Sequence, residues 1–499
     1  MKNLSNSDFS SELETLSLGV DGLDDILRGG LVSDRLYLIE GMPGSGKTTM
    51  ALQFLLEGAR NGEPVLYITL SETEAELQSV ARSHGWSLEG VYIHEVIASE
   101  DFLDPAQQHT IFHPSEVELG DTTRNISLIV DSIKPRRVVI DSLSELRLLS
   151  SNPHRYRRQI LAYKQFFARR ACTVLMLDDR PDTHDMQIRS IAHGVISLDQ
   201  TDSDYGLGRR RLRIIKYRGV NFQGGYHDYK IRRGGLVVFA RLVAAETRVF
   251  KKCIQVSSGL AELDMQLGGG LEEGTSTIIG GPPGTGKSSL AAQLAFAAIN
   301  RGDKIGMFIF EESINNLLNR TRAIGIDLAD ALECGKAVIH QVDPAEMAPG
   351  EFTDHVCREV GKNDVKMVII DSLNGYLNAM PDERFLSLHM HELLSYLGQK
   401  GVITILVGVH DGMIGNNMRS AIEASYLADN VILLRHFEYD GEVRQAISIF
   451  KKRTSDHERT IREFTISKKG VRVGNILKQF HGILTGIPTY TGNKLDETP

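Results

Sequence analysis

The sequence lacks the patterns that mark secreted, zinc-binding and membrane proteins. Its 499 residues include only four cysteines, Cys172, Cys253, Cys334 and Cys357, and no two form a Cys-x-x-Cys pair. Scattered cysteines argue against a disulfide framework or a zinc site and suit a reducing compartment. No apolar run reaches the ~20 residues that a membrane-spanning helix needs. Because residues 1–16 are polar and acidic, without a signal-peptide core, we expect a cytoplasmic protein with no membrane span.

The sequence also lacks the charge of a protein that coats nucleic acid. Its formal net charge is −8, and Trp86 is the one tryptophan. A hydrophobic content of 41% and a charged content of 24% are typical of a globular protein. The chain is too long for one ordinary core, so two domains of roughly 240 residues each are expected.

A glycine-rich loop, GMPGSGKTT, occupies residues 41–49. Its glycines let successive backbone N–H groups point into one concavity, which suits phosphate. Lys47 can reach the β- and γ-phosphate oxygens, Thr48 offers a hydroxyl to Mg²⁺, and the following helix aims its positive end at the anion. The ATP-binding residues predicted here are Gly41, Gly44, Ser45, Gly46, Lys47, Thr48 and Thr49.

A second loop of the same kind, GPPGTGKSS, occupies residues 281–289. An apolar run precedes each loop, at 35–40 and 275–280, and a helical pattern follows each. A strand, a glycine loop and a helix in this order are the context that the motif requires. The second set of predicted ATP-binding residues is Gly281, Gly284, Thr285, Gly286, Lys287, Ser288 and Ser289.

Further strands recur in both halves. Second apolar runs lie at 64–70 and 304–310, and later runs end in aspartate, at Asp141 and Asp371. Apolar runs separated by helical patterns, such as residues 391–401, predict a mostly parallel sheet covered by helices on both faces. We therefore expect two tandem α/β nucleotide-binding domains.

Carboxylates at the strand ends are candidates for metal binding and catalysis. Asp141 and Asp371 would lie beside the loops, where an acid can hold the water shell of Mg²⁺, although aspartate at a strand end also serves turns. The predicted metal ligands are Thr48, Asp141, Ser288, Asp371 and Glu311. After the second strand, Glu311 and Glu312 could orient or deprotonate the attacking water or hydroxyl, whereas the first half has Ser71 followed by Glu72.

A Lys-x-Arg pair recurs near the end of each half. Lys216 with Arg218, and Lys451 with Arg453, are two residues apart on predicted strands and so share a face. Phosphoryl transfer needs positive charge opposite the loop, and a neighbouring subunit often supplies it. Alternating charge on a strand is also typical of a solvated edge.

With glycine loops, acidic residues and Lys-x-Arg pairs in the same order twice, the chain resembles the KaiC family of double-domain ATPases in the RecA superfamily, from about residue 13 to about 470. The resemblance implies two RecA-like domains, at 1–245 and 246–475, and a tail at 476–499. It also implies a homohexameric ring with ATP and Mg²⁺ between neighbouring subunits, ATP hydrolysis mainly in the first domain and serine/threonine autokinase activity in the second. By position, Lys216, Arg218, Lys451 and Arg453 would act in trans, and Glu311 and Glu312 would match the catalytic pair.

Two departures bear on these expectations. Ser71 stands where the family has the first glutamate of the first domain, and serine is no general base at neutral pH, so Glu72 is the acid left there. The family's phosphorylated Ser-Thr pair corresponds to Ser425 and Tyr426, which leaves Ser425 as the one candidate phosphoacceptor. The tail at 475–492 combines apolar residues with Gly and Pro, as a docking segment for a signalling partner or a free end would.

Two other functions remain open at this point. A nucleic-acid motor also uses RecA-like domains, and residues 208–218 are basic, but the acidic net charge argues against it. A scaffold that reports its nucleotide state to a signalling partner, without phosphotransfer, is the other alternative.

Overall fold

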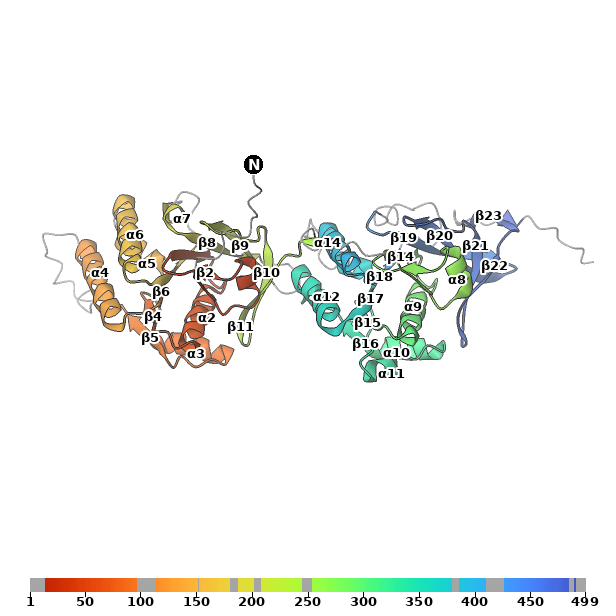
Figure 1. Ribbon diagram of the computed structural model, residues 1–499, viewed down its shortest axis with the longest axis horizontal. Coiled ribbons are helices and arrows are strands. Elements are labelled where there is room, and N and C mark those ends of the chain that lie inside the picture. The colour runs from red at the N-terminus through yellow and green to blue at the C-terminus, as the bar shows by residue number, and fades with distance from the viewer. Residues whose placement is uncertain are drawn as a thin grey trace, which may run out of the picture. The chain divides into compact units, whose positions relative to one another are not determined.

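The computed structural model describes residues 14–96, 114–150, 152–179, 187–201, 208–244, 254–343, 345–378, 386–409, 426–483 and 489–490. The chain divides into two compact units, Met1–Arg241 and Leu242–Pro499. Each unit contains one of the two glycine loops. Figure 1 colours the first unit from red to yellow-green and the second from green to blue. The predicted boundaries at residues 245 and 475 stay a prediction.

The strands of the first unit build one large sheet and one short pair. They are β1 Thr15–Leu16, β2 Leu31–Val32, β3 Leu36–Gly41, β4 Val65–Thr69, β5 Val91–Glu95, β6 Arg137–Asp141, β7 Thr173–Asp179, β8 Gly194–Thr201, β9 Arg209–Tyr217, β10 His227–Arg232 and β11 Gly235–Phe239. The large sheet has the order β11-β10-β9-β8-β3-β7-β6-β4-β5, and β1 pairs with β2. The six strands from β8 to β5 in that order are parallel, and β9, β10 and β11 extend the sheet in antiparallel pairing.

The helices of the first unit cover both faces of this sheet. They are α1 Leu23–Ile26, α2 Lys47–Arg60, α3 Glu74–His84, α4 Pro114–Ile133, α5 Leu143–Leu149, α6 Pro153–Ala168 and α7 Gln187–Ile191. One apolar core joins α1, α2 and α3 to the sheet, and a second core on the other face joins the sheet to α4, α5, α6 and α7. The continuous apolar strands that the sequence showed are therefore buried on both sides.

The second unit repeats this architecture. Its strands are β12 Gln255–Val256, β13 Leu271–Glu272, β14 Ser276–Gly281, β15 Lys304–Ile309, β16 Ala337–Gln341, β17 Val365–Asp371, β18 Ile403–Val409, β19 Asn430–Tyr439, β20 Glu442–Lys452, β21 Ile461–Ser467, β22 Gly470–Ile476, β23 Phe480–His481 and β24 Thr489–Tyr490. The large sheet has the order β16-β15-β17-β18-β14-β19-β20-β21-β22. Read from its parallel edge, this is the order of the first unit, with three antiparallel strands again at the other edge.

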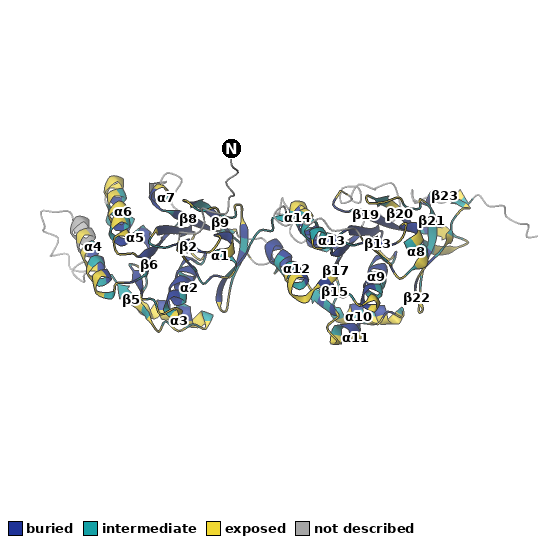
Figure 2. Ribbon diagram, in the orientation of Figure 1, coloured by how far each residue is buried: buried dark blue, intermediate teal, exposed yellow. Residues whose placement is uncertain are grey.

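Helices again cover both faces of the second sheet. They are α8 Ala261–Gln266, α9 Lys287–Arg301, α10 Ile314–Ala323, α11 Ala329–Glu333, α12 Pro349–Asn363, α13 Leu373–Asn378 and α14 Leu386–Gln399. α8 to α11 share one core, and α12 to α14 share the other. Figure 2 shows buried strands inside each unit and helices whose outer sides are exposed. The predicted fold class, two tandem RecA-like α/β domains, is confirmed. None of the described helices is both long and apolar enough to cross a membrane.

Part of the predicted tail packs on its own unit. β23 pairs with β24, and the rings of Phe480 and Tyr490 lie 5.3 Å apart. Ile483 is buried in a small core with Phe437 and Ala446 of β19 and β20. This part of the tail therefore contacts the second sheet through apolar side chains.

Candidate functional site

The first glycine loop joins β3 to α2 through a backbone that other residues would not adopt. Gly44 and Gly46 have φ angles of 79° and 95°, in the left-handed region. A Cβ on Gly46 would lie 2.6 Å from Cδ1 of Ile231, so the loop is also too crowded for a side chain there. α2 begins directly after it, at Lys47. The loop thus has the bent, closely packed backbone of a phosphate cradle at a helix N-terminus.

The second loop has the same conformation. Gly284 and Gly286 have φ angles of 80° and 91°, and a Cβ on Gly286 would lie 2.3 Å from Cδ1 of Ile466. The buried hydroxyl of Thr285 donates to the carbonyl of Pro282 at 2.8 Å and braces the loop. In the first loop, the Tyr229 hydroxyl instead donates to the backbone carbonyl of Ser45 at 2.6 Å.

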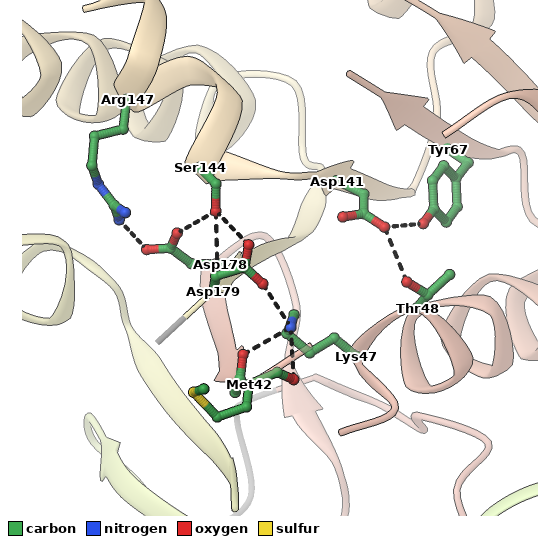
Figure 3. A network of polar contacts seen from close by, with 10 residues as sticks. Met42, Lys47, Thr48, Tyr67, Asp141, Ser144, Arg147, Asp178 and Asp179 are labelled. Atoms are coloured by element: carbon green, nitrogen blue, oxygen red, sulfur yellow. Dashed lines mark hydrogen bonds and ion pairs between the residues drawn. The ribbon is translucent and has the colours of Figure 1, made fainter. Parts of the chain in front are cut away.

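Lys47 is buried among three oxygen acceptors. Its Nζ donates to the carbonyls of Gly41 and Met42, at 2.8 Å and 3.2 Å, and lies 2.9 Å from Oδ1 of Asp179 (Figure 3). Burial by itself would raise the pKa of Asp179, but hydrogen bonds from Lys47 and Ser144 hold it below its ordinary value. Asp179 is therefore a charged partner of the loop lysine.

Lys287 has different surroundings in the second loop. Its Nζ donates to the carbonyl of Pro282 at 2.8 Å, and no salt bridge joins it to a carboxylate among the residues that the structure describes. Burial lowers the pKa of Lys287, whereas the charges of Asp371 and Glu311 act in the opposite direction. The two loop lysines thus share a backbone setting and differ in their acidic neighbours.

Thr48 and Asp141 meet beside the first loop, as predicted for a metal site. Oγ1 of Thr48 donates to Oδ2 of Asp141 at 3.2 Å, and the Tyr67 hydroxyl donates to the same oxygen at 2.6 Å (Figure 3). Burial raises the pKa of Asp141, and these hydrogen bonds act against that rise. β6 ends at Asp141 next to β4, which carries Tyr67, and this sheet edge brings the three side chains together.

Ser288 and Asp371 take the corresponding places in the second unit. Burial raises the pKa of Asp371, and hydrogen bonding from Ser288 opposes the rise. Met307 takes the place of Tyr67, because β15 pairs with β17 in the same register as β4 with β6. The second aspartate therefore lacks the tyrosine contact of the first.

These residues fit a magnesium nucleotide. The described residues contain no group of three or more His, Cys, Asp or Glu side chains that could hold a metal ion by themselves. Mg²⁺ in phosphoryl-transfer sites typically has one or two carboxylates, and phosphate oxygens and water complete its shell. One hydroxyl and one buried carboxylate beside each loop agree with that coordination.

Glu72 lies close enough to Asp141 for their charges to interact. Its Oε2 is buried and has no hydrogen-bond partner among the described residues. Burial, together with the charges of Asp141 and Glu76, raises the pKa of Glu72, and Lys47 acts against this. A half-buried carboxylate with a raised pKa suits a general base. Ser71, next to it, is exposed.

Glu311 and Glu312 are both held by neighbouring side chains. Oε1 of Glu311 accepts a short hydrogen bond from the hydroxyl of Ser372. Glu312 forms a two-pronged pair with Arg320, at 2.6 Å and 3.3 Å. Arg320 also lies 3.4 Å from Oγ of Ser289, which connects this pair to the start of α9. The two acids therefore point to different partners.

The glycine loops follow the carboxyl ends of the parallel strands, and the Lys-x-Arg pairs lie at the opposite ends, where these strands begin. Across β3, β8 and β9, Tyr37 is in register with Gly194 and Tyr217, whereas Gly41 is in register with Leu198. Lys216 and Arg218 are therefore level with the start of β3, with β8 between them and β3. The start of β3 is roughly 15 Å from its end at the loop. Lys216 donates to the carbonyls of Arg189, Ser190 and Ala192, and Arg218 donates to Ser190.

The second pair has the equivalent position. Val431 of β19 is in register with Lys451, and Gly280 at the loop is in register with Leu433, further along the same strand. Lys451 donates to the carbonyl of Ala428 at 2.8 Å, and Arg453 donates to that of Tyr426 at 3.1 Å. Neither pair is brought to the loop of its own unit.

The sequence interpretation missed several acids of the first unit. β7 ends in Asp178 and Asp179, and Asp178 pairs with Arg147 at 2.5 Å. Burial raises the pKa of Asp178 to about 6, although Arg147 opposes this. The buried Glu40 at the end of β3 accepts two hydrogen bonds from Arg189. The signal used for Asp141, an acid at the end of an apolar strand, would also have found Asp178 and Asp179.

Ser425 falls outside the described residues, and Tyr426, the next residue, is exposed. Thr49 and Ser289 are buried in the first turn of α2 and α9.

Comparisons with known proteins agree with this geometry. The family described as "ATPase: KaiC" matches residues 16–243 and again residues 256–478. The chain is 27% identical over 497 residues to circadian clock protein KaiC3 of Synechocystis sp., covering 96% of this chain and 95% of that protein. It is 26% identical to the circadian clock oscillator protein KaiC of Acaryochloris marina, over 96% and 92% of the two chains, and to that of Synechococcus elongatus, over 94% and 91%.

The family match covers both units, and each unit contains the glycine loop, the loop lysine and the strand-end aspartate that an ATPase domain needs. The resemblance drawn from the sequence is therefore confirmed, and the chain belongs to the KaiC ATPase family, with two ATPase domains in tandem.

Proposed function

We propose that this protein is a homohexameric ring that binds ATP and Mg²⁺ between neighbouring subunits. Its first domain hydrolyses ATP, its second domain also has serine/threonine autokinase activity, and the ring serves timing or signalling. The printed names of the relatives, circadian clock proteins, support the timing role. We propose domain boundaries at 1–245 and 246–475, with the tail at 476–499.

The observation that carries the ring is the place of the two Lys-x-Arg pairs. Phosphoryl transfer needs cations opposite the loop. In both units these pairs instead lie level with the start of the strand that ends at the loop. A neighbouring subunit that presents this end of the sheet to the loop completes the site. His193 at this end supports a positive field there, since burial and the charges of Arg35, Lys164 and Arg218 lower its pKa to about 4.

Within each subunit, the loops hold the phosphates and the strand-end acids hold the metal. Lys47 and Lys287 bind phosphate oxygens, and Thr48 with Asp141, and Ser288 with Asp371, hold Mg²⁺, as their hydrogen bonds and burial support. Bound Mg²⁺ neutralises charge that develops on the phosphate oxygens. Glu72 serves as the base for water in the first domain, and Glu311 with Glu312 orients the nucleophile in the second. The acceptor that we propose for autophosphorylation is Ser425.

The basic stretch on β9 gives no support to a nucleic-acid motor. Arg211 lies 3.6 Å from Asp228, and Arg213 lies 4.0 Å from Asp199. Arginines that face carboxylates on neighbouring strands leave little positive charge for a phosphate backbone. A signalling partner is the better proposal, with the tail as its docking segment and the apolar side chains around Phe480 as its support.

Sedimentation with and without ATP, combined with subunit mixing, tests the shared site. Arg218→Ala should leave nucleotide binding intact and depress hydrolysis, because Arg218 acts on the neighbour's nucleotide. Adding Lys47→Ala subunits should restore part of the turnover, since a Lys47→Ala subunit can lend its intact Arg218 to an Arg218→Ala neighbour. A hexamer that forms with ATP, together with this rescue, supports the proposal. A lone chain that hydrolyses ATP at full rate, or a mixture without rescue, contradicts it.

A further inference from the structure

The first and second units differ at the strand that lies beside each glycine loop. In the first unit, β7 places Asp178 next to Glu40 and Asp179 next to Gly41 in the parallel register. In the second unit, β18 places Gly408 next to Gly280 and Val409 next to Gly281. A carboxylate therefore ends the strand beside one loop, and an aliphatic residue ends the strand beside the other.

Asp179 is fixed in this place by a chain of polar contacts (Figure 3). Its Oδ2 accepts from the hydroxyl of Ser144 at 3.0 Å, and the same hydroxyl lies 3.3 Å from Oδ1 of Asp178. Asp178 is held in turn by Arg147 of α5 at 2.5 Å. The network orients the Asp179 carboxylate toward Lys47, with 2.9 Å between Oδ1 and Nζ.

This carboxylate acts on the atom that binds the end of the nucleotide. The ammonium of a loop lysine contacts the β- and γ-phosphate oxygens. Asp179 competes for the Lys47 ammonium. Because Lys47 would contact the terminal phosphates, the negative charge of Asp179 would lie near them. A nucleoside triphosphate brings one more anionic group to this place than a diphosphate. Repulsion from the Asp179 carboxylate therefore weakens the binding of the triphosphate more.

We propose that Asp179 is a specificity-determining residue of the first unit, which weakens binding of nucleoside triphosphate relative to nucleoside diphosphate at that loop. The second unit has Val409 at this place and so lacks this carboxylate. The inference rests on the proposed function, because it assumes that each loop binds its own nucleotide. With Asp179 present, the ratio of the affinity for ADP to the affinity for ATP is higher in the first unit than in the second.

The test compares affinities for ADP and for a non-hydrolysable β,γ-imido analogue of ATP, with Mg²⁺ present. The full chain carries Lys287→Ala, so that the first loop alone binds nucleotide. Adding Asp179→Asn should tighten binding of the ATP analogue about tenfold, which is about 1.4 kcal/mol, and should change ADP binding much less. Asp179→Glu keeps the charge and should keep the parent's ratio of the two affinities.

A reciprocal change and a distant change serve as controls. In a Lys47→Ala chain, Val409→Asp should weaken the ATP analogue relative to ADP by about the same factor. This arm also keeps the inference testable if Asp179→Asn impairs folding. Asp131→Asn removes one negative charge, which pairs with Arg170. Arg170 precedes β7, and the start of β7 lies about 20 Å from its end at Asp179. It should leave the ratio unchanged.

The outcomes separate the inference from the proposed function. Equal gains for both nucleotides in Asp179→Asn, or a gain with Asp131→Asn of the same size, would overturn the inference alone. A Lys287→Ala chain that binds no nucleotide, or still binds two, would overturn the proposed independent sites and the inference with them.

Discussion

The two glycine loops of this protein have nearly the same backbone and different charges around them. Gly46 and Gly286 precede their helices with φ angles of 95° and 91°. Lys47 forms an ion pair with Asp179, whereas Lys287 contacts the carbonyl of Pro282. The difference shows that loop geometry alone does not set the charge around a loop lysine, because a carboxylate at the end of the neighbouring strand contributes to it in the first unit.

The acids that follow β4 in the first unit and β15 in the second also differ, but here the acids of the second unit are the ones with partners. In the second unit, Arg320 holds Glu312 and Ser372 holds Glu311. In the first unit, Val80 takes the place of Arg320 on the corresponding helix, and Oε2 of Glu72 has no hydrogen-bond partner among the described residues. The first unit thus keeps one acid near Asp141 with a buried oxygen that has no partner within the described part of the chain. The second unit keeps a pair of acids fixed by partners.

The largest expected effect tests whether the two loops are independent. Lys47→Ala and Lys287→Ala should each weaken nucleotide binding at one loop by on the order of 10²–10³, because each removes charge-assisted hydrogen bonds to two phosphates. Counting bound nucleotide per chain by equilibrium dialysis should give one in each variant and two in the parent. If either single change empties both loops, the comparison between two separate sites fails.

The next effect tests the unpaired acid. With Lys287→Ala present, Glu72→Gln should slow ATP hydrolysis about a hundredfold, the usual contribution of a general base. The raised pKa of Glu72 in the parent also predicts loss of activity as the pH falls through that raised pKa, because the base must be deprotonated.

Glu74→Gln is the control for this test. It alters an exposed acid two residues further along the chain, whose charge is not among the causes of the raised pKa of Glu72, and should leave the rate near that of the parent. A Glu72→Gln chain with the parent's rate and the parent's pH profile would show that another group activates the water.

A smaller effect is expected from giving the first unit the acid of the second. Ser71→Glu places a carboxylate where Glu311 stands, and Ser142 follows Asp141 as Ser372 follows Asp371. A hydrogen bond from Ser142 would then orient the new acid, and hydrolysis in the first unit should rise several-fold, on the order of tenfold at most. Steady-state phosphate release measures it. Ser71→Gln has nearly the same size without the charge, and an equal rise with it would contradict the charge argument.

The sequence alone predicted the fold class. It also predicted that the loops, Asp141 and Asp371 lie together at the carboxyl ends of the parallel strands, where the structure has them. It did so because each of these features occurs twice, and the second copy supports the first. The same reasoning passed over Asp178 and Asp179, since a search for what recurs does not find acids present in one half only. It also passed over Arg320 and Tyr67. The Arg320–Glu312 contact depends on how α10 turns back toward the end of β15, and the Tyr67–Asp141 contact depends on the register between β4 and β6.

The smallest effect concerns the acids found in one half, and it is a pH dependence of stability. Burial raises the pKa of Asp178 from an ordinary 3.8 to about 6, so the folded first unit holds a proton there between these values that the unfolded chain releases. This contribution to stability is fully present below pH 3.8 and is lost as the pH rises through about 6. Relative to Asp178→Asn, the parent should therefore gain about 1 kcal/mol between pH 7 and pH 5. For a domain of this size, that gain corresponds to roughly 2–4 °C in the melting temperature, measurable by thermal unfolding at both pH values.

Gly408→Ala is the control, because Gly408 of the second unit takes the place of Asp178 in the first. This variant should show the parent's pH dependence. If the parent instead loses stability relative to Asp178→Asn when the pH falls from 7 to 5, Arg147 keeps Asp178 ionised and the argument fails.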